Sequence, residues 1–378
     1  MRNTAILVCF VAMPVVHHSL AADEPKPAIA EPKAISPERI AELVKKLEEP
    51  MRQLEHLDPK EGPPDGPAPK TNFRTHWPEI YQLKWAGAAA RPAVFALLAD
   101  LTKPGQARAN AGIVLVDWLL GKGAKQEPDA EVLATLKAAL KDKDPALKWG
   151  ILHSSRSYGA TETLDRFKVV EHRPPNVKLE SLYFSDAAMD GLLPEVIALV
   201  GDEDPEVAAE AGYEIFSFGR PKQGVKELLS AIKRKEERVR VFAAMALSRV
   251  GRDDPDALAA VLAELKPEKY KSGYGRVLEA AGRFGPKAKA AVPALLAEVK
   301  AERWKDNTDP AHYACYDCED AIRALGNIGP DVKEAVPEIL KYLVFSGISG
   351  QGSVNDLIAA MDKIDATGAK AANSTARV

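Results

Sequence analysis

Aromatic residues are scarce in this chain, and runs typical of β-strands are few. Phe, Trp and Tyr together make up 6% of the 378 residues, whereas alanine recurs through the apolar segments. The apolar stretch AILVCFVAMPVV at 5–16 is shorter than the roughly 20 residues that a transmembrane helix needs. These shortages argue against a sheet-based fold and against a protein that spans a membrane.

Catalytic motifs are also missing. The sequence has no Gly-x-Ser-x-Gly, no His-Glu-x-x-His, no Walker loop and no glycine pattern for dinucleotides, and its histidines are scattered. A formal net charge of −3 argues against a general nucleic-acid binder. We therefore expect a protein that is not an enzyme, needs no cofactor and binds no nucleic acid.

The first 21 residues predict a signal peptide. Arg2 precedes the short apolar stretch, and Ser19-Leu20-Ala21 places small residues at the cleavage positions. Cleavage after Ala21 removes Cys9 and leaves two cysteines in the mature chain. We therefore expect an exported protein, periplasmic or extracellular, with no membrane span after cleavage. The proline-rich residues 22–35 predict a flexible spacer behind the signal peptide.

The C-terminal half repeats itself. VLEAAGRFGPKAKAAVPALLAEV at 277–299 returns as AIRALGNIGPDVKEAVPEILKYL at 321–343, and Gly285-Pro286 aligns with Gly329-Pro330. A repeat of this length, with two helices around a Gly-Pro corner, is typical of a stacked α-solenoid.

These motifs resemble HEAT repeats, of the kind also found in bilin-lyase-like HEAT proteins. The resemblance implies an all-α fold, a right-handed α-solenoid of about six helix pairs with one irregular insertion. It also implies a scaffold that binds a protein or peptide on its concave side, which the second helix of each pair lines.

Composition divides the chain into segments. Ser36-Pro37 begins an N-terminal helix at 36–58, and a Pro/Gly-rich linker follows at 59–77. The repeat array should cover 78–345, interrupted by an insertion at 160–190 that we expect to form an ordered hairpin. Residues 346–378 should hold a capping helix, expected at 354–364, and a flexible tail.

Helix pairs are expected along the whole array. The first helices should cover 91–101, 128–141, 192–200, 222–233, 255–265, 287–301 and 331–344. The second helices should cover 107–120, 146–158, 206–218, 238–250, 274–284 and 315–328. Four of the first helices contain a proline that should bend them, namely Pro92, Pro194, Pro293 and Pro337.

Cys315 and Cys318 are three residues apart in a predicted helix, with His312 three residues before them. Their spacing fits a local disulfide in an oxidising compartment or two buried thiols. It also fits a redox pair or, with a fourth ligand, a zinc site. The alternative function is therefore a redox or metal-binding module, or a bilin-lyase-like enzyme.

A candidate binding row follows from helical geometry. When Val207 or Val239 faces the core, the residues three, six and ten places later point away from it. Phe242 and Met245 are then large apolar residues that the core does not claim, unless they pack under a neighbouring repeat. The predicted partner-binding residues are Glu210, Tyr213, Phe242, Met245, Arg249, Arg276, Arg283 and Arg323.

Overall fold

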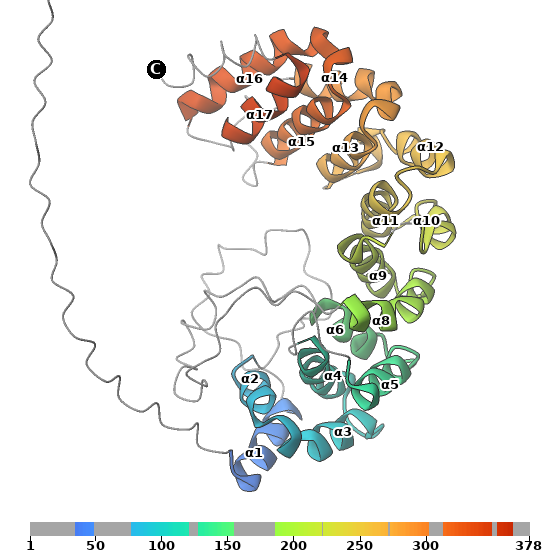
Figure 1. Ribbon diagram of the computed structural model, residues 1–378, viewed down its shortest axis with the longest axis vertical. Coiled ribbons are helices and arrows are strands. Elements are labelled where there is room, and N and C mark those ends of the chain that lie inside the picture. Colours follow the sequence, from blue (N-terminus) through green and yellow to red (C-terminus); the bar gives the residue numbers. More distant parts are fainter. Residues whose placement is uncertain are drawn as a thin grey trace, which may run out of the picture.

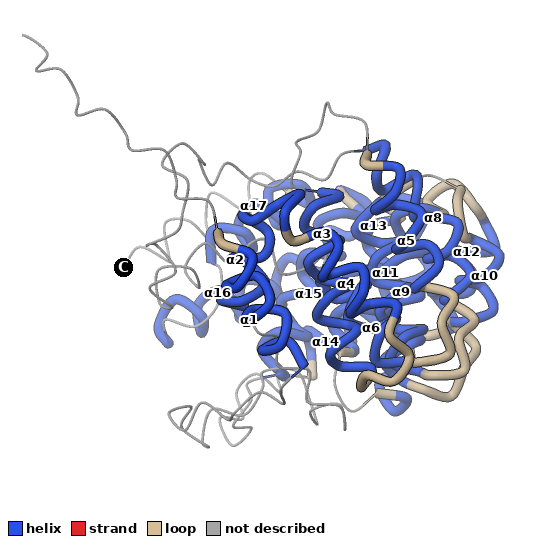
Figure 2. Tube along the Cα trace, turned by 90° about the horizontal axis from the view of Figure 1, so that it is seen from below, coloured by secondary structure: helices blue, strands red, loops and turns tan. Residues whose placement is uncertain are grey.

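The computed structural model describes residues 35–48, 77–120, 128–154, 186–220, 222–270, 273–301, 313–349 and 354–365. Within these ranges every regular element is an α or 3-10 helix. The helices follow one another in a curved stack that is open on one side (Figure 1). Figure 2 shows the same helices and their connecting loops from below the stack. The predicted all-α solenoid is confirmed.

Two rows of helices run along the stack, and the inner row lies on its concave side (Figure 1). Each inner helix packs against the next inner helix in the row. The inner row is formed by α4 (Gly105–Leu120), α6 (Pro145–Ser154), α9 (Pro205–Phe218), α11 (Glu237–Val250), α13 (Tyr274–Arg283), α15 (Tyr313–Ile328) and α17 (Val354–Ile364). The outer row is formed by α3 (Arg91–Ala99), α5 (Ala130–Ala139), α8 (Asp186–Leu199), α10 (Val225–Ala231), α12 (Pro255–Ala263), α14 (Val292–Lys300) and α16 (Val336–Ser349).

Helices α1 (Pro37–Glu48) and α2 (Trp77–Ala86) pack together against the first pair of the stack. The rest of the predicted N-terminal helix, the linker at 59–76 and the signal peptide lie outside the described residues. At the other end, α17 packs on α15 as the next inner helix. The predicted capping helix therefore forms one more pair with α16. Among the described helices, none combines the length and apolar character that crossing a membrane requires.

Local signals explain why several helices begin and end as predicted. Asp204 and Asp254 each accept hydrogen bonds from backbone N–H groups two and three residues later, which caps α9 and α12. Gly219 ends α9 in the left-handed conformation, with φ 64° and ψ 26°, which glycine adopts without strain. Four inner helices, α9, α11, α13 and α17, match their predicted ranges within one residue.

The structure corrects the role of three prolines. Pro92, Pro293 and Pro337 each occupy the second residue of a helix, and only Pro194 lies inside one, in α8. A proline in the first turn loses no helical hydrogen bond, because the N–H there has no partner within the helix. The chain instead bends before these prolines, in the short 3-10 segments η1 (Gly87–Ala89), η5 (Gly285–Ala291) and η7 (Pro330–Ala335).

The predicted insertion at 160–190 is too long at its C-terminal end. Residues 186–190 belong to α8, which begins at Asp186, because Ala187 and Ala188 favour helix and Ala188 is buried in the core. The remainder of the insertion, and with it the expected hairpin, lies outside the described residues.

Candidate functional site

Three aromatic side chains meet between α9 and α11. The rings of Tyr213 and Phe242 pack edge to face with their centroids 5.4 Å apart. Phe216, one helical turn after Tyr213, lies 6.1 Å from the Tyr213 ring. Such aromatic pairs stabilise a contact by about 0.5–1.5 kcal/mol beyond the area they bury.

Arginines cover these rings. Arg238 and Arg276 lie 5.5 Å and 5.8 Å from the centroid of Phe242, so that ring is contacted from both α11 and α13. Arg249 and Arg283 lie 5.5 Å and 4.8 Å from the centroid of Phe216. Guanidinium groups at these distances are attracted to the face of an aromatic ring. We call this set the arginine–aromatic layer: Tyr213, Phe216, Phe242, Arg238, Arg249, Arg276 and Arg283.

The burial of α11 corrects part of the predicted row. Phe242 is 4% exposed and Met245 is 8% exposed, so these side chains do not stand clear of the core. The reason is that α11 packs against α9 and α13 along the inner row and against α10 and α12 behind it. Arg238 and Arg276 cover the ring of Phe242 in addition. Tyr213, Arg276 and Arg283 are half-buried, and Arg249 is exposed.

Glu210 also differs from the prediction, because it is fully buried. One carboxylate oxygen lies 3.2 Å from Nδ1 of His153, and the other lies 3.6 Å from Nη2 of Arg238. The His153 ring stacks on Trp149 with a centroid distance of 4.3 Å. Glu210 therefore links α6, α9 and α11 beneath the concave surface and is not a residue that a partner can reach.

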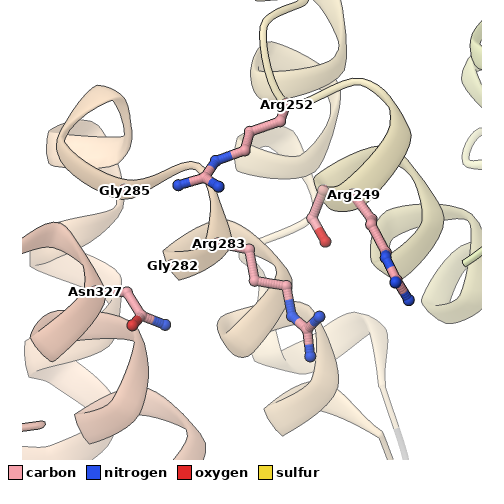
Figure 3. Close-up of a pocket in the computed structure, with 7 residues that line it drawn as sticks. Arg249, Arg252, Gly282, Arg283, Gly285 and Asn327 are labelled. Carbon is pink, nitrogen blue, oxygen red and sulfur yellow. The ribbon is translucent and has the colours of Figure 1, made fainter. Parts of the chain in front are cut away.

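A hollow with a volume of about 330 Å³ opens at the C-terminal ends of α11, α13 and α15. Arg249 and Arg283 of the arginine–aromatic layer line it, so the two features are continuous. Figure 3 shows Arg252 extending toward Gly285, Arg249 and Arg283 projecting from α11 and α13, and Asn327 reaching in from α15. The lining consists of Ser248, Arg249, Arg252, Gly282, Arg283, Gly285 and Asn327.

The N-terminal half of α15 carries the opposite charge, in Asp317, Glu319 and Asp320. Arg323 is bound to Glu319 at 2.8 Å and to Asp320 at 2.7 Å, so its charge is already paired within α15. Asp317 accepts a hydrogen bond from the backbone N–H of Gly275 at 2.7 Å. Burial, reinforced by the nearby carboxylates of Glu279 and Asp317, raises the pKa of Asp320 to about 7 despite Arg323.

This raised pKa predicts a pH-dependent stability. Between about pH 4 and pH 7 the folded chain keeps a proton on Asp320 that the unfolded chain has lost, so stability falls as pH rises through that window. Asp320→Asn stays neutral and should raise the free energy of unfolding near pH 8 by on the order of 2 kcal/mol. Urea unfolding of both proteins near pH 5 and pH 8 measures the difference.

Asp253→Asn is the control for that experiment. Asp253 is exposed, and its hydrogen bond from Lys287 lowers its pKa. The substitution should therefore not stabilise the protein near pH 8. Equal pH dependence of the wild type and Asp320→Asn would contradict the prediction.

Of the two predicted disulfide partners, the structure describes the side chain of Cys318 alone. Cys318 is fully buried in α15, whereas the side chain of Cys315 and the whole of His312 lie outside the described residues. Within the described part of the chain, no three His, Cys, Asp or Glu side chains gather as a metal ion requires. The disulfide and its redox and metal alternatives stay predictions.

Sequence reasoning missed Phe216, Arg238 and Arg252. Phe216 is nine residues after Val207 and Arg238 directly precedes Val239, so both fall outside the spacing used to choose the row. Arg252 lies beyond the end of α11, where helical periodicity gives no direction. The signal that could have found it is the recurrence of arginine near the ends of successive inner helices, at 249, 252 and 283.

The fold and this surface define an α-solenoid of paired helices. Residues 193–272, from within α8 to just beyond α12, match the family model for HEAT repeats. These residues form HEAT repeats, and the same pairing of helices continues in the described chain on both sides of them. An engineered protein with a crystal structure from the Northeast Structural Genomics Consortium is 17% identical, with a TM-score of 0.35, over 75% of this chain and 81% of its own. No curated protein matches the chain.

Proposed function

We propose that this protein is an exported, non-enzymatic scaffold that binds a protein or peptide partner on its concave face. HEAT-repeat solenoids serve in general as surfaces for protein interaction, because stacked pairs expose a long regular face. The observation that carries the proposal is the arginine–aromatic layer. Tyrosine and arginine are enriched among the residues that dominate binding energy at protein interfaces.

The layer is suited to binding because its arginines are held in place before a partner arrives. Arg249 donates to the backbone carbonyl of Phe216 at 2.8 Å, and Arg283 donates to Glu279 at 2.7 Å. Ordering these long side chains in advance lowers the entropy cost of association. Phe242 and Met245 act beneath this surface as its support.

Export is supported by the N-terminal sequence alone. Arg2, the apolar stretch and Ser19-Leu20-Ala21 have the order of a cleavable signal peptide. The compartment matters for the partner, since an exported scaffold meets only exported or surface-bound molecules.

Site-specific photo-crosslinking tests both parts of the proposal. A photoreactive benzoylphenylalanine replaces Ser217, which is half-buried at the end of α9 on the inner row, in a tagged chain expressed in its own cells. The protein recovered from the exported fraction should begin at Ala22 by mass spectrometry. It should carry a defined protein adduct after illumination.

The matched control places the same amino acid at Lys226, an exposed residue of α10 on the outer row. Adducts from both positions would mean that contact is not specific to the concave face. A recovered chain that still begins at Met1 would refute export.

A further inference from the structure

Two glycines, Gly282 and Gly285, line the hollow at the ends of α11, α13 and α15. A side chain at Gly285 would approach the guanidinium of Arg252, since its Cβ would lie 3.9 Å from Nη2. Gly285 also has φ +65°, a conformation that other residues rarely adopt. A Cβ at Gly282 would point toward Ala324 of α15, so this glycine sets the close approach of α13 and α15 at the edge of the hollow.

Its charge has one sign. Three of the seven lining residues are arginines and none is acidic. Lys363 of α17 adds another cation nearby, with its Nζ 3.2 Å from Oδ1 of Asn327. Of the neighbouring acids, Glu279 pairs with Arg283 of the lining, whereas Asp253 is bound to Lys287. Arg249, Arg252 and Lys363 therefore bring cationic groups to the hollow that no carboxylate among the described residues is bound to.

Of the three arginines that line the hollow, Arg252 is the one whose N–H groups form no hydrogen bond to another described residue. Arg249 is bound to the carbonyls of Phe216 and Ser217, and Arg283 to Glu279. Arg252 is exposed and forms no hydrogen bond or ion pair within the described part of the chain. Its five N–H groups match the two oxygens of a carboxylate, to which arginine binds in a bidentate manner.

We propose that this hollow binds carboxylate side chains of the partner, so that the partner segment is acidic. The inference rests on the proposed function and names the chemistry of its partner. Arg252 holds one carboxylate in the hollow, and the arginines of the adjoining layer attract further acidic residues along α11 and α13. A segment rather than a single small anion fits, because the arginines are distributed over both helices.

Carboxylate is favoured over phosphate by the backbone around the hollow. Phosphate sites commonly use the N–H groups and the positive dipole end of a helix N-terminus. Here the C-terminal ends of three helices approach, where carbonyl oxygens project and the dipole is negative. The donors that this hollow offers are thus arginine side chains and not the N–H groups of an α-helix N-terminus, and a guanidinium matches the two oxygens of a carboxylate.

Fluorescence anisotropy on the mature full-length chain tests the proposal. The probe is a fluorescein-labelled peptide of alternating glutamate and glycine, and its partner probe has glutamine in place of every glutamate. The wild type should bind the glutamate peptide at least about tenfold more tightly than the glutamine peptide. Added salt should weaken that binding.

Arg252→Ala should weaken binding of the glutamate peptide about tenfold. Its melting temperature should stay that of the wild type, because Arg252 is exposed and unbound. The control Lys226→Ala removes a positive charge from the outer row and should leave binding unchanged.

Three results would overturn the proposal. They are equal binding of the two peptides, undiminished binding to Arg252→Ala, and tighter binding of a phosphoserine version of the peptide, which would make the hollow a phosphate site. The photo-crosslinks from Ser217 distinguish a failure of the acidic-segment proposal from a failure of the scaffold proposal. If a partner crosslinks to the concave face equally well with and without Arg252→Ala, the scaffold proposal stands and the recognition of an acidic segment is refuted.

Discussion

Replacing Gly282 with alanine is expected to lower the free energy of unfolding by about 3 kcal/mol. A Cβ at this position would lie 2.3 Å from Cα and 2.5 Å from Cβ of Ala324, so α13 and α15 could not keep their separation. The obstacle is backbone, which cannot rotate away as a side chain can. The better helix propensity of alanine returns only about 1 kcal/mol.

Gly201→Ala provides the matched control. A Cβ there has the carbonyl oxygen of Ala198 as its nearest neighbour, at 3.6 Å, which is an ordinary contact. Urea unfolding of the two variants should show a large loss for Gly282→Ala and little change for Gly201→Ala. A loss below about 1 kcal/mol for Gly282→Ala would show that α13 and α15 separate easily.

Phe242→Ala is expected to cost about 4 kcal/mol of stability. The side chain is 4% exposed and contacts Tyr213, Arg238 and Arg276, so its removal leaves a cavity between α9, α11 and α13. Thermal unfolding followed by circular dichroism measures the effect. The substitution also tests the correction made above, because an exposed docking residue could be removed without such a loss.

Leu101→Ala is the control for a large apolar residue at the surface. Leu101 is 77% exposed, just beyond α3, and its replacement should change stability by less than about 0.5 kcal/mol. Equal melting temperatures for the wild type and Phe242→Ala would contradict the burial of Phe242 and would support the exposed binding residue that the sequence predicts.

The positions of many helices could be predicted from the sequence, but which of their side chains are exposed could not. Asp-Pro starts and glycine ends are local signals, and they located helices such as α9 and α12. The row of binding residues assumed that each inner helix buries one side. An inner helix instead packs between two neighbouring inner helices and also against the outer helices. Almost every residue of α11 is therefore buried, because α9, α10, α12 and α13 all contact it. Periodicity within one helix contains no information about those neighbours.

The tight packing of the glycines sets how the arc can deform. At Gly282 and Gly326 the backbones of α13, α15 and α17 approach so closely that no added Cβ fits. Such joints resist shear, since sliding would drive backbone into backbone. Between α9 and α11 the approach leaves more room, since a Cβ at Gly212 would lie 3.5 Å from the backbone of Phe242, which is an ordinary contact. We therefore expect the arc to bend more readily between α9 and α11, beside the arginine–aromatic layer, than at the glycine contacts of α13, α15 and α17.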